Sequence, residues 1–519
     1  MKKSTLLKSN EKDFLFEEVT VEELIAGYQN GEYTAQEVVQ SYLDRIHELE
    51  QFYNAFTFMN PNALEDAKNI DRLREEGAEL GPLAGIPIVI KEAVDVAGFP
   101  STFGWAPLCK ESGGIELMPV KDAPVVARLK EAGAIILGKT NIPAFSCAYN
   151  ANNSWDGPTY NAVNRSISPG GSSSGTATAV SGNFAVLGVA EETAGSIQVP
   201  AAAQALVGIK PSFGLIPNVG VTPLGGTTRD VLGPHARTVQ DAALMLSVMA
   251  GYSKEDPKTI SSIGNIPKNG YTSFLDKNFL QGKRLGLYGP GWRTQELSAE
   301  TQKLYLAAIE VLKAQGAEVV EDPFAGTGLA EYVSSKGGPS ALVGLGLETF
   351  FYDLEKYLKH LNPEDPSLSI KTVFDKAKSI PWTEDGPLAL VHDYVNAETA
   401  EADHSILPDL SEFYETKGEL LRMIHQVMEN KGLDGFVYPQ MPTAIPSIQE
   451  NVVQSTIISE INISGLPLIT VPAGYYESGS PFALAFFGKM WSEGELIGMA
   501  YAYEQATKHR KAPVLYPEY

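Results

Sequence analysis

Residues 168–200 read SPGGSSSGTATAVSGNFAVLGVAEETAGSIQVP, with two turns rich in glycine and serine on either side of one apolar run. Glycine lets the backbone take conformations that other residues avoid and lets a ligand approach closely. The apolar run has the length and composition of a buried strand. We therefore expect a strand flanked by two loops that carry serine hydroxyls and backbone N–H groups.

A lysine ends a second apolar run, because residues 85–91 read GIPIVIK. The ammonium of a free lysine has a pKa of about 10.4, and burial can lower that pKa by several units. A neutral Lys91 could then accept the proton of a serine, which needs a base before it acts as a nucleophile. The plainer interpretation is that Lys91 leaves the core and extends its ammonium to water.

The second glycine-rich turn contains Ser196 within EETAGSI. The small residues before Ser196 allow successive backbone N–H groups to point at one spot, as an oxyanion hole requires. No histidine lies in a glycine-rich turn, so histidine is not predicted to be the base. The seven histidines are His47, His235, His360, His392, His404, His425 and His509.

Four motifs follow one another in an order that matches a known family: GIPIVIK, GAIILGKTN, GGSSSG and ETAGSI. The segment that contains them, residues 85–197, resembles the amidase signature family, whose catalytic triad is a serine, a second serine after a cis peptide bond, and a lysine. The likeness continues through VGIKPSFG and INISGLPLITVPAG, so it covers most of the chain.

This resemblance implies the roles of individual residues. Ser196 would be the nucleophile, Ser172 the relay serine and Lys91 the base, with the cis bond between Gly171 and Ser172. Backbone N–H groups of Thr193, Ala194, Gly195 and Ser196 would form the oxyanion hole. Ser146, Gly171 and Ser173 would contact the substrate.

The resemblance also implies the reaction, hydrolysis of a carboxylic amide to an acid plus ammonia or an amine through a serine acyl-enzyme. The segment FFGKMWSEGELIGMAYAYEQATKHRKAP, residues 486–513, is most similar to the peptide amidase branch. Gln198 stands where the family usually has arginine, and Glu192 stands where it often has aspartate. Without that guanidinium, we expect neutral aryl, alkyl or peptide amides as substrates.

Three other functions stay open. The chain could be the amidase-like subunit of a glutamine-dependent transamidating complex, or a binding protein built on an inactive amidase fold. It could be a serine esterase, because residues 171–175 also fit G-x-S-x-G with Ser173 as the nucleophile. The segment before that motif is polar and ends at Pro169, whereas the esterase motif should follow a strand. A phosphate-binding loop is excluded because Thr176 replaces the lysine it requires.

Composition agrees with a soluble enzyme, and because no histidine pair is spaced for a metal, we predict neither metal nor cofactor. The chain has 519 residues and a formal net charge of −23, which disfavours nucleic acid and anionic membranes as partners. Cys109 and Cys147 provide no disulfide framework, which favours the cytoplasm. We expect no secretory leader, no membrane span and no metal site, and a homo-oligomer is possible.

The predicted fold class is α/β: one amidase domain over residues 1–519, with a large mixed β-sheet covered on both faces by helices. Capping boxes at Thr20 and Thr34 predict N-terminal helices within about residues 18–80. The expected strands include residues 86–90, 134–137, 184–189, 284–288, 317–321, 435–438 and 468–471.

A helix-rich insertion is predicted over about residues 324–408, near the substrate cleft. Its aromatic segment contains Phe350, Phe351, Tyr352 and Tyr357. These side chains either pack the helices together or form a wall over the cleft.

Overall fold

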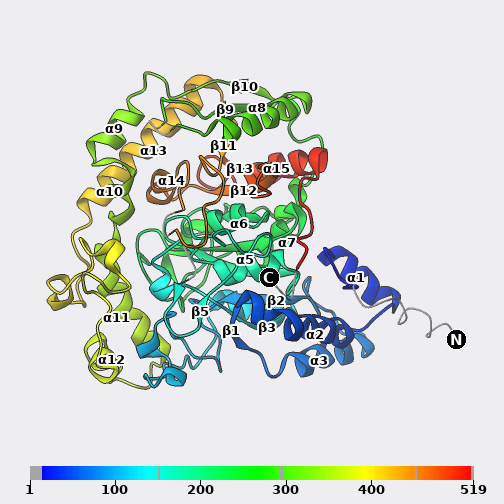
Figure 1. Ribbon diagram of the computed structural model, residues 1–519, viewed down its shortest axis with the longest axis vertical. Coiled ribbons are helices and arrows are strands. Elements are labelled where there is room, and N and C mark those ends of the chain that lie inside the picture. Colours follow the sequence, from blue (N-terminus) through cyan, green and yellow to red (C-terminus); the bar gives the residue numbers. More distant parts are fainter. Residues whose placement is uncertain (1–13, 150–151, 293–295, 451–452, 516–519) are drawn as a thin grey trace.

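The computed structural model describes residues 14–149, 152–292, 296–450 and 453–515, and its centre is an eleven-stranded sheet (Figure 1). The strand order is β1-β3-β2-β6-β8-β7-β12-β13-β11-β9-β10. Residues 1–13, on which the expectation about a leader mainly rests, lie outside the described residues. The strands are β1 Phe56–Met59, β2 Pro87–Lys91, β3 Ile135–Thr140, β6 Leu187–Glu192, β7 Val207–Lys210, β8 Val231–Ala236, β9 Arg284–Leu287, β10 Glu318–Val320, β11 Gly435–Pro439, β12 Leu468–Tyr475 and β13 Pro481–Phe487, with a separate pair β4 Asn152–Asn153 and β5 Gly157–Pro158.

The sheet is mixed, as predicted. Strand β2 runs parallel to both of its neighbours, β3 and β6, whereas β8 runs antiparallel to β6 and β7. At the other end of the sheet, β9 runs parallel to β10 and β11. Every residue of β2, β3 and β6 is buried, which explains why these strands are apolar over most of their length.

Helices cover the sheet on both faces, and the fold class predicted from the sequence is confirmed. The helices α5 and α6 pack on each other and on central strands, and α7 and α15 form another such pair. Both predicted capping boxes are present, at the starts of α1 and α2. The helices are α1 Val21–Asn30, α2 Ala35–Tyr53, α3 Ala63–Glu75, α4 Pro124–Glu131, α5 Ser174–Ser181, α6 Gln198–Ala203, α7 Val239–Met249, α8 Ala299–Ala314, α9 Leu329–Ser335, α10 Gly338–Gly344, α11 Phe350–Leu361, α12 Ile370–Ala377, α13 Ser411–Lys431, α14 Ser459–Ser464 and α15 Glu493–Thr507.

Helix α5 lies unusually close to the sheet because its side chains are small. All eight of its residues, SGTATAVS, are buried. A Cβ atom at Gly175 would lie 2.3 Å from the carbonyl oxygen of Ala55 and 2.4 Å from the backbone nitrogen of Asn141. This close approach holds the loop that precedes α5 against the ends of the neighbouring strands.

The strand expected over residues 184–189 begins and ends three residues later, as β6 Leu187–Glu192. Sequence patterning ends the strand before its two glutamates, since charged residues are rarely buried without a partner. Both glutamates are buried here, and each has a partner: Glu191 contacts Lys91, and Glu192 accepts hydrogen bonds from the start of α6. The partner of Glu191 is distant in the sequence, whereas the partners of Glu192 lie in the next turn.

The predicted insertion contains α9, α10, α11 and α12, which with α13 form a column along one side of the molecule (Figure 1). Phe350, Phe351 and Tyr357 are buried in one apolar cluster with Phe145, whereas Tyr352 is only partly buried. These aromatic side chains therefore pack the helices to the body of the protein.

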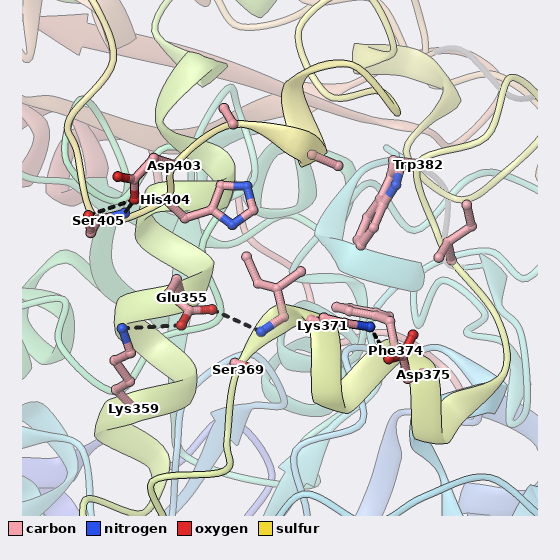
Figure 2. A pocket seen from close by; sticks show the side chains of 14 residues that line it. Glu355, Lys359, Ser369, Lys371, Phe374, Asp375, Trp382, Asp403, His404 and Ser405 are labelled. Atoms are coloured by element: carbon pink, nitrogen blue, oxygen red, sulfur yellow. Dashed lines mark hydrogen bonds and ion pairs between the residues drawn. The ribbon is translucent and has the colours of Figure 1, made fainter.

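The insertion also holds a cavity of about 540 Å³ beside α11 and α12 (Figure 2). Its wall includes Phe374, Trp382 and His404. Phe374 contacts Trp105, whose ring lies 5.5 Å from that of Phe145. None of the predicted site residues lines this cavity, so it is separate from them.

A buried hydrogen bond fastens α11 to the loop after β2. The Tyr357 hydroxyl donates to Asp95 Oδ1 at 2.7 Å, and Ser101 donates to the same oxygen at 2.7 Å. Burial raises the pKa of Asp95 to about 6. The loop that follows Lys91 is thus tied directly to the insertion.

Replacing Tyr357 by phenylalanine should lower the free energy of unfolding by about 1–3 kcal/mol, because a buried carboxylate loses a donor. Urea unfolding followed by circular dichroism measures this change. The matched control is Tyr352→Phe on the same helix, whose hydroxyl has no hydrogen-bond partner among the described residues. If the two variants were equally stable, the hydrogen bond from Tyr357 to Asp95 would not contribute to stability as proposed.

Candidate active site

Two of the predicted catalytic residues, Lys91 and Ser172, are in contact at the carboxyl end of a strand that runs parallel to its neighbours. Lys91 is the last residue of β2, and Glu191 lies at the end of the adjacent strand β6. Ser172 lies in the loop before α5, and Ser196 lies in the turn between β6 and α6. Neighbouring parallel strands end at the same edge of the sheet, which brings Lys91 and Glu191 together, and Ser172 contacts Lys91 there.

Lys91 does not reach water, because its side chain is completely buried. Its Nζ atom lies 2.7 Å from Ser172 Oγ, 3.0 Å from the main-chain carbonyl oxygen of Glu191 and 2.7 Å from Glu191 Oε2. A tetrahedral amine nitrogen has three positions besides the bond to its own carbon, and these three contacts fill all of them. The interpretation that Lys91 extends to solvent is wrong.

Two opposing effects act on the proton of Lys91. Burial, the larger effect, lowers the pKa of Lys91 below its usual value, because the charged form loses water. The carboxylate of Glu191 favours the charged form, and Asp230 and Glu192 act in the same direction. The net result is a lysine whose pKa is lowered, as a lysine that serves as a base needs.

The loop before α5 carries Ser172 and Ser173. The peptide bond between Gly171 and Ser172 is cis, in agreement with the expectation. The neighbouring Ser173 is fully buried, and its hydroxyl donates to the carbonyl oxygen of Glu191 at 3.1 Å. The N–H of Glu191 donates to Ser173 Oγ at 3.3 Å. Ser173 is therefore engaged by the backbone of β6.

Ser196 is the more accessible serine, with 6% of its surface exposed, whereas Ser172 and Ser173 have none. No hydrogen bond joins the Ser172 and Ser196 hydroxyls, both of which the structure describes. Hydrogen bonds between catalytic groups are often long in free enzymes and tighten when substrate binds.

The turn that carries Ser196 has backbone N–H groups without internal acceptors. Among the described residues, the N–H groups of Ala194, Gly195 and Ser196 donate no hydrogen bond. Gly195 has a φ of 106°, and a Cβ atom there would lie 2.7 Å from Ile458 Cδ1, so glycine is required. The Tyr149 hydroxyl donates to the carbonyl oxygen of Ala194 at 2.6 Å and holds the turn.

Thr193, also predicted in the oxyanion hole, joins two buried carboxylates. Its hydroxyl lies 2.7 Å from Asp230 Oδ1 and 3.3 Å from Glu191 Oε1. Asp230 also accepts hydrogen bonds from the N–H groups of Leu224 and Gly225. Burial and the nearby Glu191 raise the pKa of Asp230 to about 7.

The side chain of Gln198 is fully buried in a polar network. Its Nε2 atom donates to Glu192 Oε1 at 2.7 Å, and its Oε1 atom accepts from Gln440 Nε2 at 2.8 Å. Glu192 Oε2 accepts the N–H groups of Ile197 and Gln198 at the start of α6. Both functional groups of Gln198 are thus used within the protein, and Glu192 shapes the turn around Ser196.

Ser146, predicted to contact substrate, lies in a segment with unusual backbone conformation. Both Phe145 and Ser146 have positive φ values, 55° and 54°. Ser146 is 7% exposed, and its hydroxyl has no hydrogen-bond partner among the described residues. A buried hydroxyl without a partner is available to a ligand.

Sequence reasoning did not assign roles to Glu191, Asp230 and Gln440. The doubled glutamate at the end of an apolar strand was a usable signal for Glu191, because burying a charge requires a partner. Asp230 and Gln440 reach the site from other strands and loops, and their sequence surroundings contain no recognised motif.

The described parts of the chain show neither a cluster of metal ligands nor a helix that could span a membrane. No group of three or more histidine, cysteine, aspartate or glutamate side chains is placed to hold a metal ion there. Within the same residues, no helix has the length and apolar character needed to cross a membrane.

Comparisons with known proteins cover nearly the whole chain. The family model described as Amidase matches residues 37–497. A glutamyl-tRNA(Gln) amidotransferase subunit of Alkaliphilus metalliredigens is 31% identical over 510 residues, which cover 94% of this chain and 96% of that protein. A probable amidase of Arabidopsis thaliana is 30% identical over 519 residues, covering 96% of this chain and 92% of that protein.

A solved structure agrees with these matches. The peptide amidase of Stenotrophomonas maltophilia superposes with a TM-score of 0.80 at 31% sequence identity, covering 97% of this chain and 100% of that chain. The family expected from the four motifs is confirmed, and so is the likeness to peptide amidase. By its motifs, its fold and these matches, the chain belongs to the amidase family.

Proposed function

We propose that this protein hydrolyses a neutral carboxylic amide through an acyl-enzyme on Ser196, with Ser172 as proton relay and Lys91 as base. The observation that carries the proposal is the 2.7 Å contact between the fully buried Lys91 Nζ and Ser172 Oγ. A buried amine with a lowered pKa in contact with a serine hydroxyl has the arrangement of a base and its proton relay, and Ser196 follows the strand that carries Glu191.

In the acylation step, Ser196 Oγ forms a bond to the carbonyl carbon of the amide. Its proton passes to Ser172, and the proton of Ser172 passes to neutral Lys91. The carbonyl π electrons move to oxygen, where N–H groups of the turn from Ala194 to Ser196 can donate to the oxyanion. Removing one such donor typically costs a factor of about 100–1,000 in rate.

The tetrahedral intermediate then collapses and its C–N bond breaks. The leaving nitrogen takes a proton from Ser172, which regains one from Lys91, so that ammonia or an amine departs. Water attacks the ester on Ser196 and gives its proton to the same relay. Release of the acid returns Ser196 to its hydroxyl form and Lys91 to its neutral form.

The substrate class is inferred from Gln198, which lies two residues after the proposed nucleophile. Gln198 occupies the position of the family's usual arginine and uses both its amide groups in contacts with Glu192 and Gln440. No guanidinium is therefore provided there for a substrate carboxylate, and burying an unpaired carboxylate is costly. Peptide amides and aryl or alkyl amides fit this site, and likeness to a peptide amidase supports the first.

The main alternative is the amidase-like subunit of a glutamine-dependent transamidating complex. A relative with 31% identity is named as a component of this kind, which favours this second candidate. An esterase that uses Ser173 is disfavoured, because that hydroxyl is buried between the backbone groups of Glu191. A binding protein on an inactive fold is disfavoured because all three triad positions are filled. A homo-oligomer and a cytoplasmic location remain part of the proposal.

Replacing Ser196 by alanine should lower kcat by about 1,000-fold or more, because the covalent step loses its nucleophile. Ammonia release from N-acetyl-phenylalaninamide measures the rate, and circular dichroism checks that the fold is intact. The comparison variant is Ser173→Ala. If Ser173→Ala loses turnover while Ser196→Ala retains it, the esterase-type assignment replaces this one.

Lys91→Ala should cost several orders of magnitude in kcat, and Lys91→Arg should not restore activity, because a guanidinium stays protonated. For the wild type, kcat/KM should rise with pH as Lys91 loses its proton. The midpoint of this rise should lie below about 10.4, the pKa of free lysine, because burial lowers the pKa of Lys91. A profile that ignores Lys91 substitutions and follows His235 instead would exclude the proposed base.

Neutral amides should be better substrates than amides that carry a free carboxylate. The measurement is kcat/KM for N-acetyl-phenylalaninamide, p-nitroacetanilide, glutamine and malonamic acid with the purified chain. Gln198→Arg is the matched variant and should improve the two acidic substrates relative to the neutral ones. A wild-type kcat/KM for glutamine above that of every neutral amide would support the transamidating alternative.

A further inference from the structure

Lys91 receives two of its three contacts from a single residue. The carbonyl oxygen of Glu191 lies 3.0 Å from Lys91 Nζ, and Glu191 Oε2 lies 2.7 Å from it, while Ser172 Oγ occupies the third position. Lys91 and Glu191 have 0% and 2% of their surfaces exposed, so water does not substitute for any of these partners.

The chemistry of a neutral amine decides which way its protons point. Neutral Lys91 has two N–H bonds and one lone pair. A peptide carbonyl and an ionised carboxylate can only accept, so both groups of Glu191 must take N–H bonds. The lone pair is then left for Ser172, whose hydroxyl must donate to it, as the proposed acylation step requires.

We propose that Glu191 is a positioning residue that accepts both N–H bonds of neutral Lys91 and thereby fixes the lone pair of Lys91 on Ser172. This inference rests on the proposed function, since it concerns the same base. Glu191 does not touch the reacting atoms and acts only through Lys91.

The charge of Glu191 has a second, opposing consequence. If the Lys91–Glu191 pair holds an extra proton, that proton either makes Lys91 an ammonium or makes Glu191 a donor that competes for the lone pair. Either state is inactive. Glu191 therefore orients the lone pair of Lys91, but its negative charge also favours the protonated form of Lys91 at lower pH.

Other groups face Lys91 and act on the same proton. Those from the neighbouring strands and loops are Glu191, Glu192, Asp230 and His235. Burial lowers the pKa of His235 to about 4, so His235 is neutral at ordinary pH, and its Nε2 atom lies 2.8 Å from the carbonyl oxygen of Ile197. Of the carboxyl groups that the structure describes, Glu191 alone contacts Lys91 directly.

Because of the contacts of Thr193, a substitution can remove the charge of Glu191 without moving the oxygen that accepts from Lys91. In a Glu191→Gln variant, the amide oxygen can keep the place of Oε2 against Lys91. Its NH₂ group then faces Thr193 Oγ1, 3.3 Å from Oε1 in the wild type, and Thr193 can accept because its own proton goes to Asp230 at 2.7 Å. Glutamine thus keeps the acceptor and removes the charge, while aspartate keeps the charge and withdraws the acceptor.

The experiment measures kcat/KM for N-acetyl-phenylalaninamide between about pH 5 and pH 10 in wild type, Glu191→Gln, Glu191→Asp and Glu191→Ala. For Glu191→Gln, the rise with pH should move about one to three units lower, with a plateau close to that of the wild type. For Glu191→Asp and Glu191→Ala, the plateau should fall by about tenfold to 100-fold, because the lone pair is no longer fixed.

The matched control is Glu50→Gln, since Glu50 is a partly buried glutamate that accepts the N–H of Phe56 and does not contact Lys91. It should leave both the plateau and the midpoint unchanged. Thermal unfolding of each variant identifies any loss of fold, and the shift in Glu191→Gln tests the role of charge by itself.

Two results would overturn the inference: a midpoint in Glu191→Gln that stays in place or moves to higher pH, or equal plateaus in Glu191→Ala and Glu191→Gln. Failure of the proposed function gives a different result. In that case Lys91→Ala itself retains wild-type activity, and the Glu191 variants have no base to position.

Discussion

The structure around the proposed site depends on one buried lysine that has to find all its partners within the protein. Lys91 has no contact with water, and its three neighbours come from the loop before α5 and from the end of β6. A charge or an amine so placed is tolerable only if each polar position is matched. This requirement explains why Glu191 stands near the end of β6 and why the loop at Ser172 is held so close.

The close approach itself depends on small side chains. Helix α5 can lie against β2 and β6 because its residues are glycine, alanine, serine, threonine and one valine, and a Cβ at Gly175 would collide with two backbone segments. The glycine of this serine-rich sequence therefore serves packing. A rigid helix on a buried parallel strand pair fixes both ends of the contact between Lys91 and Ser172.

Several strands and helices and the family could be predicted from the sequence because their signals are local. Apolar runs identified β2 and β3, capping boxes located α1 and α2, and the ordered motifs identified the family. The strand β6 was misplaced by three residues because its glutamates look like surface residues in isolation. Whether a charge is buried depends on a partner, and Lys91 is 100 residues away from Glu191. The contact between Tyr357 and Asp95 spans 262 residues and was invisible for the same reason.

Gln198, which replaces the family's usual arginine, is held in its place by hydrogen bonds within the protein. A lone glutamine could still turn toward a substrate, but here Glu192 accepts from its nitrogen and Gln440 donates to its oxygen. Thr470 in turn donates to Gln440 Oε1 at 2.9 Å, so each member of the network is held by the next. Turning Gln198 toward the cleft would leave Oε1 of the buried Glu192 carboxylate without its donor, which costs more free energy than one weak contact with substrate would gain. The neutral character of the site is therefore a property of the whole network behind the nucleophile.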